Sequence, residues 1–134
     1  MIEQTLLLIK PNATLHKHAG EIISIIENQA FVLRDIRIMK FDRDSAAVFY
    51  QEHLGKEFYA RLIDFMCSGT TIALLLEKEN AVEALRDLIG DTNPAKRRKG
   101  TIRDLYAEGI TENAVHASDS PAHAQREISL IFHY

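Results

Sequence analysis

The chain of 134 residues is predicted to be a mixed α/β protein, and three observations lead to this prediction. Short apolar runs typical of buried strands alternate with segments whose apolar residues recur at helical spacing. Hydrophobic residues make up 46% of the chain and charged residues 26%, as in an average globular protein. No internal repeat and no low-complexity linker divides the sequence. A single domain spanning residues 1–134, with one sizeable core, is therefore expected.

The first part of the chain predicts a strand, a helix and a second strand. Residues 5–9 form an apolar run that stops at Pro11, as expected of a buried strand ending in a turn. Isoleucines recur at helical spacing in residues 19–26. Residues 31–41 are rich in β-branched and aromatic residues, and they predict a strand with one face in water. The alternating charged and apolar residues of this strand are Asp35, Ile36, Arg37 and Ile38.

The middle of the chain predicts two helices and a third strand. Either Asp42 or Asp44 is suited to cap the first helix, which runs to about residue 50. A second helix is expected from residue 58 until Ser68 and Gly69 interrupt it. Residues 71–76 then form another apolar run, which predicts a buried strand.

The last part predicts a helix, a long loop, a short strand and a final helix. Asn80 opens the helix with Glu83 three residues later, which resembles a capping box. Residues 91–112 show no sustained periodicity and are expected to form a long loop of functional importance. A short strand follows at residues 114–116, and the sequence Ser120-Pro121 starts the last helix. This order of elements predicts a ferredoxin-like sandwich: a four-stranded antiparallel sheet covered by helices, with the long loop before the last strand.

Charge and cysteine content exclude several classes of protein. The formal net charge is −3, so the chain has no overall attraction for nucleic acid or anionic lipid. A single cysteine, Cys67, excludes an internal disulfide framework and a multi-cysteine zinc site. The apolar N-terminal run is too short to span a membrane and lacks the basic start of a signal peptide. A cytoplasmic protein without a membrane partner is expected.

The segment Asn113-Ala-Val-His116-Ala-Ser-Asp-Ser120 carries the strongest chemical signal. A neutral imidazole is a nucleophile that accepts a group and passes it on. The surrounding hydroxyls, the amide and the start of a helix are suited to bind phosphate oxygens. Lys10, Arg86 and Arg103 are candidate cations for the charge that spreads over a phosphoryl group in transfer. No glycine-rich phosphate loop is present, so side chains would have to hold the phosphate.

Five motifs resemble those of the nucleoside diphosphate kinase family, in the family's order and spacing. Any one of them is weak, but together they cover nearly the whole chain. They are Lys10-Pro-Asn12, Phe49-Tyr-Gln-Glu-His53, Asp91-Thr-Asn-Pro94, Gly100-Thr-Ile-Arg103 and the segment from Asn113 to Ser120.

The resemblance implies a role for each candidate site residue. His116 would be the nucleophile of a ping-pong phosphoryl transfer, Glu127 would hold its ring, and Ser118 would support that carboxylate. The groups near the ribose 3′-hydroxyl and the transferring phosphate would be Lys10, Tyr50 and Asn113. The groups holding the outer phosphates would be Arg86, Thr92 and Arg103. Phe58 and Ile110 would sandwich the base without reading its edge.

The resemblance also implies cofactors and partners. The γ-phosphoryl group of a nucleoside triphosphate, mainly ATP, would pass to a nucleoside diphosphate. Mg²⁺ would be carried by the nucleotide phosphates and not by protein ligands. A homo-oligomer, either a tetramer or a hexamer built from dimers, would be expected. The basic run Lys96-Arg-Arg-Lys99 has no aromatic residues between its charges, so nucleic acid is not expected as a partner.

Several positions depart from the family pattern, including Thr70, which follows Gly69 where proline is frequent. Ala117 follows the histidine where glycine is usual, Glu112 stands where arginine is common, and Glu57 stands where proline is usual. If the backbone at position 117 needs a positive φ, alanine would cost roughly 1 kcal/mol or more. These departures leave open an alternative, a catalytically weak nucleotide- or nucleic-acid-binding module on the same scaffold.

Overall fold

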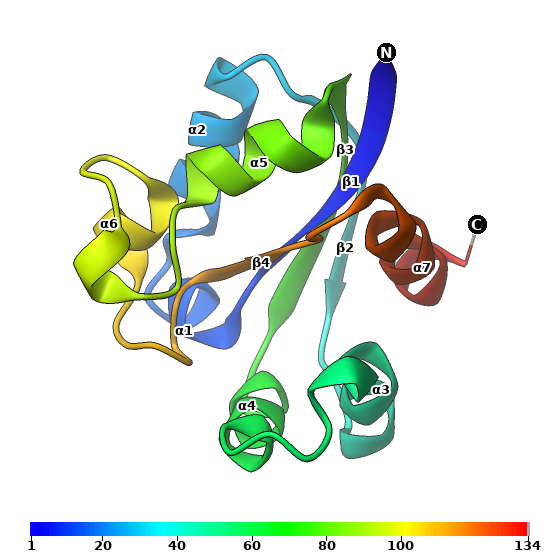
Figure 1. Cartoon of the computed structure of the whole chain (residues 1–134), viewed down its shortest axis with the longest axis vertical. Coiled ribbons are helices and arrows are strands. Elements are labelled where there is room, and N and C mark those ends of the chain that lie inside the picture. Colours follow the sequence, from blue (N-terminus) through cyan, green and yellow to red (C-terminus); the bar gives the residue numbers. More distant parts are fainter. Residues whose placement is uncertain (134) are drawn as a thin grey trace.

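The computed structural model describes residues 1–133 and contains one four-stranded sheet with helices on both faces (Figure 1). Neighbouring strands are antiparallel throughout. Their spatial order is β2-β3-β1-β4. The strands are β1 (Ile2–Ile9), β2 (Val32–Met39), β3 (Thr71–Glu79) and β4 (Val115–Ala117). The predicted ferredoxin-like α/β sandwich is confirmed.

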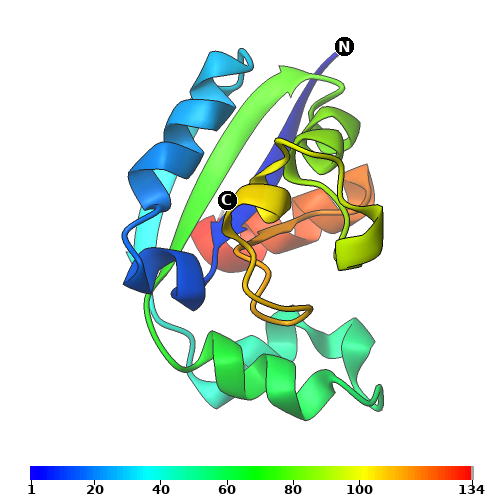
Figure 2. The same cartoon turned by 90° about the vertical axis from the view of Figure 1, so that its left-hand side faces the viewer.

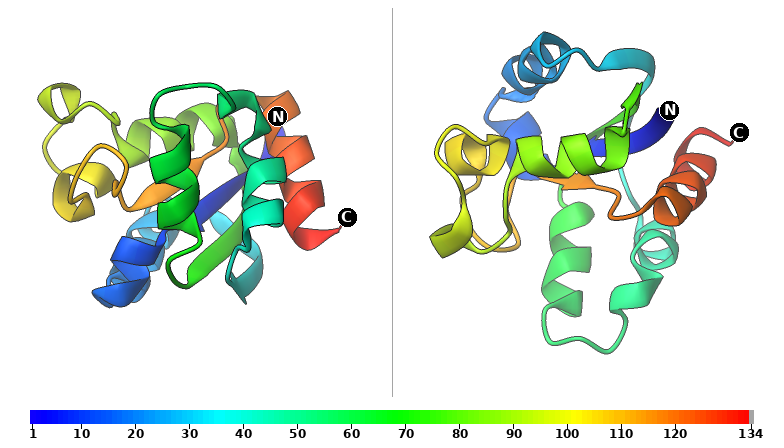
Figure 3. Two further views of the ribbon diagram at one scale, coloured as in Figure 1. Left: turned by 90° about the horizontal axis from the view of Figure 1, so that it is seen from below. Right: turned by 45° about the horizontal axis from the view of Figure 1, so that its top comes forward.

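The alternation of side chains along β1 divides the core into two layers. Leu6 and Leu8 point into one layer and Leu7 and Ile9 into the other, and all four are fully buried. The first layer is covered by α3 (Arg43–Phe49), α4 (Tyr59–Met66) and α7 (Pro121–Phe132). The second is covered by α1 (Pro11–Leu15), α2 (Ala19–Asn28), α5 (Ala81–Ile89) and α6 (Ile102–Tyr106). Figures 2 and 3 show the pair α3 and α4 standing beyond one end of the sheet.

Most predicted elements are present, with small shifts of their ends. Asp42 and not Asp44 caps α3, and it forms a reciprocal capping box with Ser45. Ser120 caps α7 by accepting a hydrogen bond from the backbone N–H of His123, with Pro121 in the first turn. No helix within residues 1–133 is both long and apolar enough to cross a bilayer.

The predicted capping box at the start of α5 is wrong. Asn80 has a left-handed backbone (φ 53°), and its side chain makes no capping hydrogen bond. A residue distant in sequence performs the cap, since the carboxylate of Glu3 on β1 accepts a hydrogen bond from the Val82 N–H at 2.8 Å. Tertiary structure thus replaces the local cap that the sequence indicates.

Two segments expected to be irregular contain helices. The turn predicted at Pro11 is the five-residue helix α1. The predicted loop at residues 91–112 holds a 3₁₀ turn (Pro94–Lys96) and α6, whose N-cap is Thr101. Both α-helices are too short to show a clear hydrophobic period, which explains why the sequence pattern missed them.

The predicted dry face of β2 is also wrong. Ile36 is 48% exposed and Ile38 is 71% exposed. The strand lies at the edge of the sheet, with β3 as its single neighbour, and its register shifts between Leu33 and Asp35. An exposed edge strand with apolar side chains is a typical site for pairing with another chain.

Gly90 is expected to be intolerant of substitution. Its φ is +87°, and a Cβ added there would lie 2.5 Å from Oγ1 of Thr101. Gly90→Ala combines backbone strain with overpacking, so we expect the free energy of unfolding to fall by about 2–4 kcal/mol in urea titrations. Gly100→Ala, at φ +88° but in open space, should cost only about 1–2 kcal/mol. Gly20→Ala on α2 meets nothing within 4 Å and should be neutral or stabilising.

Candidate active site

One cavity of about 380 Å³ brings together the predicted site residues, with the exception of Ser118. They come from segments far apart in the sequence, including the ends of β1 and α3, the start of α4, and the segment around β4. The predicted residues that line it are Lys10, Tyr50, Phe58, Arg86, Thr92, Arg103, Ile110, Asn113, His116 and Glu127. Ser118 lies directly behind the cavity wall, where it contacts Glu127.

His116 and Glu127 form a hydrogen-bonded pair in the cavity wall. His116 is the middle residue of β4, and its Nε2 lies 2.8 Å from Oε1 of Glu127 on α7. The same carboxylate oxygen accepts a hydrogen bond from the Ser118 hydroxyl at 2.7 Å. Glu127 is 3% exposed and Ser118 is fully buried. The edges of the Phe49 and Tyr50 rings pack against the imidazole and fix its position further.

The charge state of Glu127 determines which histidine nitrogen is available. Burial opposes ionisation, but the hydrogen bonds from His116 and Ser118 hold the pKa of Glu127 below its usual range. An ionised carboxylate only accepts hydrogen bonds, so Nε2 of His116 carries the proton that it donates. In the neutral ring, Nδ1 then keeps its lone pair. The hydrogen bond to Glu127 thus leaves Nδ1 as the ring nitrogen with a lone pair, in a histidine that lines the cavity.

Lys10 lies at the end of β1 and is buried beside Asn113. Its Nζ donates a hydrogen bond to Oδ1 of Asn113 at 3.0 Å, and the Asn113 amide donates to the Ile110 carbonyl at 2.8 Å. Burial and the charge of Arg103 lower the pKa of Lys10 to about 7, although Glu112 opposes the shift. An anion placed in the cavity would restore the charge of this ammonium group.

Arg103 donates hydrogen bonds to two backbone carbonyls and has one N–H group without a partner in the described residues. Its two terminal nitrogens donate to the carbonyls of Gly90 and Val115, each at 2.9 Å, which ties α6 to β4. Its Nε is buried and has no hydrogen-bond partner within residues 1–133. Burial and the nearby charges of Arg86 and Arg97 lower its pKa to about 10, so it remains charged at neutral pH.

Tyr50 also has an unpaired polar group. The ring is 3% exposed, and its hydroxyl has no hydrogen-bond partner in the described part of the chain. Burial and the charge of Glu127 raise its pKa, so the hydroxyl stays protonated and remains a donor. Buried polar groups without partners are uncommon, and at a cavity wall such a hydroxyl is suited to bind a polar group of a ligand.

Two apolar side chains at the cavity are exposed to solvent. Phe58, the N-cap residue of α4, is 45% exposed, and Ile110 in the segment before β4 is 67% exposed. Phe58 also lies near the His53 ring and the Lys56 ammonium group. Neither is a core residue, so the site role predicted for Phe58 is favoured over the core alternative.

The positive φ that would have made alanine costly at position 117 is absent there, but it is found three residues earlier, at Ala114. Ala117 has no positive φ, so alanine replaces glycine there without strain. Ala114 has φ +77°, and the Val115 N–H donates to the Asn113 carbonyl at 3.0 Å, which closes a γ-turn. The Lys10 N–H donates to the Ala114 carbonyl at 2.8 Å and holds this turn in place.

Several residues that line the cavity were not predicted to be site residues from the sequence. They are Glu52, His53, Leu62, Thr111, Ala117 and Asp119. His123 on α7 contacts Asp119 through Nδ1 and Glu52 through Nε2. Glu52, His53 and Asp119 belong to segments already noted for their motifs, and proximity to Tyr50 and His116 was the signal that could have found them.

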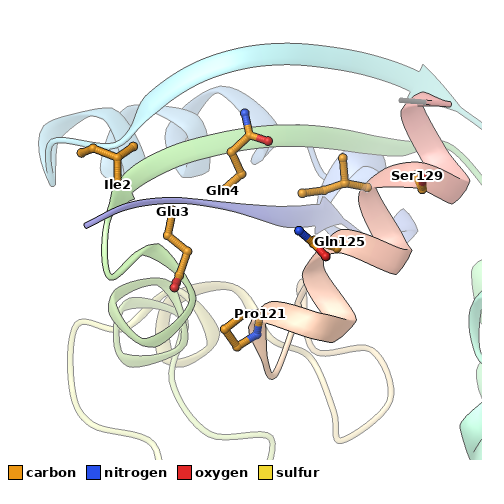
Figure 4. A pocket seen from close by; sticks show the side chains of 7 residues that line it. Ile2, Glu3, Gln4, Pro121, Gln125 and Ser129 are labelled. Atoms are coloured by element: carbon orange, nitrogen blue, oxygen red, sulfur yellow. The ribbon is translucent and has the colours of Figure 1, made fainter.

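The described residues offer no metal-binding cluster, and the cavity between β1 and α7 has none of the chemical groups of this site. No group of three or more His, Cys, Asp or Glu side chains within residues 1–133 is placed to hold a metal ion. A cavity of about 510 Å³ lies between the start of β1 and α7 (Figure 4). Its lining side chains lack a histidine–carboxylate pair and a cation; they are Ile2, Glu3, Gln4, Pro121, Gln125, Ile128 and Ser129.

The fold and the cavity define the class of protein. It is a ferredoxin-like α/β protein that presents a carboxylate-oriented histidine to a cavity lined with cations. Residues 3–134 match the family described as Nucleoside diphosphate kinase. The chain belongs to the nucleoside diphosphate kinase family.

Relatives and solved structures agree with this assignment. A nucleoside diphosphate kinase of Methanocaldococcus jannaschii is 46% identical over 132 residues, which cover 98% of this chain and 94% of the relative. One from Actinobacillus pleuropneumoniae serotype 3 is also 46% identical, with 98% and 96% covered. The crystal structure of the Aquifex aeolicus enzyme superposes with a TM-score of 0.95 at 35% identity, covering 98% and 96% of the two chains. That of the Encephalitozoon cuniculi enzyme gives 0.93 at 30% identity, covering 96% and 88%.

Proposed function

We propose that this protein is a nucleoside diphosphate kinase that moves the γ-phosphoryl group of a nucleoside triphosphate, mainly ATP, to a nucleoside diphosphate by a ping-pong route. The observation that carries the proposal is the His116–Glu127 hydrogen bond at 2.8 Å, which leaves Nδ1 with its lone pair. In the first half-reaction, Nδ1 forms a bond to the γ-phosphorus, and the bond to the bridging oxygen breaks. The nucleoside diphosphate leaves with the electron pair.

The second half-reaction reverses these bonds with a different acceptor. A terminal phosphate oxygen of the incoming nucleoside diphosphate attacks the phosphohistidine, and the P–N bond breaks to regenerate neutral His116. Glu127 stabilises the ring while it is positively charged, and Ser118 keeps the carboxylate in place. Positioning and charge stabilisation supply most of the rate in phosphoryl transfer, so the surrounding cations matter as much as the nucleophile.

The remaining side chains bind and orient the nucleotide. Lys10, the free hydroxyl of Tyr50 and the amide of Asn113 act near the transferring group and the ribose hydroxyl. The outer phosphates are held by Arg86, Thr92 and Arg103, and arginine side chains suit paired phosphate oxygens. Phe58 and Ile110 hold the base through its faces, which gives a broad tolerance for different bases.

Mg²⁺ is proposed to enter with the nucleotide phosphates. The donor set fits this arrangement, because each carboxylate lining the cavity already contacts a histidine: Glu127 contacts His116, and Glu52 and Asp119 contact His123. When bound, Mg²⁺ neutralises part of the phosphate charge. The residues themselves bind the phosphates and orient His116. The cytoplasm remains the proposed location, consistent with a single cysteine.

The proposed activity is tested by mass spectrometry of the intact chain after a brief exposure to ATP and Mg²⁺ without an acceptor. A mass increase of one phosphoryl group that is lost in acid, and lost on addition of a nucleoside diphosphate, is the expected result. A chain that binds ATP but gains no mass would favour the alternative, a nucleotide-binding module with little transfer activity. At present no feature of the site favours that alternative, since Ala117 fits its backbone without strain.

A homo-oligomer, a tetramer or a hexamer built from dimers, is proposed through the exposed edge of β2. Ile38 is the most exposed apolar side chain of that strand. Ile38→Asp places a charge on the edge, so we expect the mass measured by light scattering to fall toward that of one chain. Leu105→Asp, which changes an exposed residue of α6, is the matched control and should keep the native mass. An unchanged mass for Ile38→Asp would contradict this use of β2.

A further inference from the structure

The two apolar walls of the cavity belong to different parts of the fold. Phe58 and Leu62 lie on or beside α4, which stands beyond the end of the sheet, whereas Ile110 and Thr111 precede β4. Figure 2 shows the loop before β4, in orange, reaching down toward α4. The spacing between these walls sets the width of the slot available to a nucleotide base. This inference rests on the proposed function, in which Phe58 and Ile110 enclose the base.

An ion pair joins the two walls at a point outside the cavity. Arg61 on α4 donates from Nη2 to Oε1 of Glu112 at 2.7 Å and from Nε to Oε2 at 3.3 Å. The guanidinium group therefore contacts both carboxylate oxygens, which fixes the orientation of the two side chains as well as the distance between them. Arg61 directly precedes Leu62, and Glu112 directly follows Thr111, so each partner is adjacent to a residue that lines the cavity.

The segment that carries Glu112 is tightly bound to itself and to α1. The Glu112 carbonyl accepts hydrogen bonds from the N–H groups of Glu108 and Gly109, at 2.7 and 3.2 Å, and from the Asn12 amide at 3.3 Å. The Ile110 carbonyl is held by the Asn113 amide. Because this loop is closed by its own hydrogen bonds, a force on Glu112 moves Ile110 with it.

We propose that the Arg61–Glu112 ion pair is a positioning device that sets the width of the base slot. Neither residue touches the reacting atoms, so their effect passes through Leu62, Phe58 and Ile110. The pair explains why this chain has Glu112 where arginine is common in the family: an acidic residue is needed opposite Arg61. A loose slot weakens nucleotide binding, but it leaves the His116–Glu127 pair unchanged.

The primary test measures KM and kcat for GDP and UDP in Arg61→Gln, using the full-length chain and saturating ATP as the donor. We expect KM to rise about three- to fivefold for both acceptors, as is typical of losing one partly exposed ion pair. kcat and the phosphohistidine yield should stay within about twofold of native. Arg43→Gln is the matched control. Arg43 on α3 pairs with Asp64, which lies on α4 as Arg61 does, and neither residue lines the cavity. Equal KM values for the two variants would overturn the proposal.

A charge exchange tests the pair independently of side-chain loss. Glu112→Arg alone places two arginines together and should raise KM at least as much as Arg61→Gln. The double variant Arg61→Glu and Glu112→Arg restores opposite charges, so its KM should return toward the native value. A double variant with a KM no lower than those of the single variants would overturn the proposal, because an unrelated structural defect is not repaired by reversing charges.

Gly109 offers a third variant that keeps both charges. A Cβ at this position would lie 2.9 Å from Oε1 of Glu112, so Gly109→Ala pushes the carboxylate away from Arg61. We expect the same rise in KM, and an unchanged KM would count against the proposal. ADP binding measured by calorimetry reports on the slot independently of catalysis. If the native chain transfers no phosphoryl group, the proposed function is refuted. If the native chain transfers phosphate and the variants keep native KM values, only the positioning role is refuted.

Discussion

Replacement of His116 by alanine is expected to abolish phosphoryl transfer, with kcat falling by at least about 10⁴-fold, because the proposed nucleophile is lost. The phosphorylated species should disappear from the mass spectrum of the intact chain. Nucleotide binding measured by calorimetry should persist, since Lys10, Arg86 and Arg103 remain. If the His116→Ala protein still transferred phosphate, another residue would have to be the phosphate carrier.

The control for this variant must separate chemistry from folding. The carboxylate of Glu127 keeps its hydrogen bond from Ser118 when His116 is removed, so the fold should survive with a moderate loss of stability. His16→Ala removes another histidine that pairs with a glutamate, Glu108, but outside the cavity. It should retain native turnover. Circular dichroism melts of both variants show whether the inactive protein is folded.

Replacement of Lys10 by methionine is expected to stabilise the protein at neutral and acidic pH while nearly eliminating activity. The folded protein holds the pKa of Lys10 at about 7, against 10.5 for the free side chain, because the ammonium group is buried. Below pH 7 both states are protonated, and the folded state bears the full cost of a buried charge. Between pH 7 and 10.5 the unfolded chain binds more protons, so native stability rises with pH.

The stability difference between native protein and Lys10→Met should therefore depend on pH. We expect the variant to be more stable by roughly 2–3 kcal/mol at pH 6, after allowance for the unpaired Asn113 oxygen, and the difference to vanish toward pH 10. Urea titrations across this range measure it, and the exposed Lys99→Met is the matched control. A variant less stable than native protein at pH 6 would contradict this account of Lys10.

Although Lys10→Met is expected to be more stable than the native protein, it should be less active. Loss of one positioned cation in a buried phosphoryl-transfer site is expected to lower kcat/KM by about 10²–10³-fold. Nucleotide phosphates raise the pKa of the native lysine, so binding of ADP near pH 8 should take up a proton. Calorimetry in buffers of different ionisation enthalpy detects that uptake, which Lys10→Met should lack.

Hydrophobic pattern predicted the central architecture because the central strands are buried on both faces. The runs at residues 5–9 and 71–76 became β1 and β3, whose leucines fill both core layers. The pattern was wrong at β2, since alternation does not distinguish an edge strand from one covered by helices. It also could not show that Glu3, and not Asn80, completes the start of α5, because that contact joins distant segments.

The site was predicted by motif and not by physical pattern. The order and spacing of the motifs identified side chains that line the cavity, but they did not reveal the burial or the hydrogen bonds of these side chains. Burial of Lys10, the unpaired hydroxyl of Tyr50 and the two carbonyl contacts of Arg103 all depend on tertiary packing. The backbone angles were likewise needed to show that Ala114, and not Ala117, has a positive φ.

The sheet order pairs the first strand with the last, and this has a consequence for protein synthesis. β1 has β4 as its neighbour, and the carrier on β4 needs Glu127 from the final helix. During synthesis, Lys10, Tyr50 and Arg86 therefore leave the ribosome before β4 and α7, which complete the wall of the cavity. Under the proposed mechanism, a chain stalled before residue 127 lacks the carboxylate that orients His116, so we expect it to transfer no phosphate.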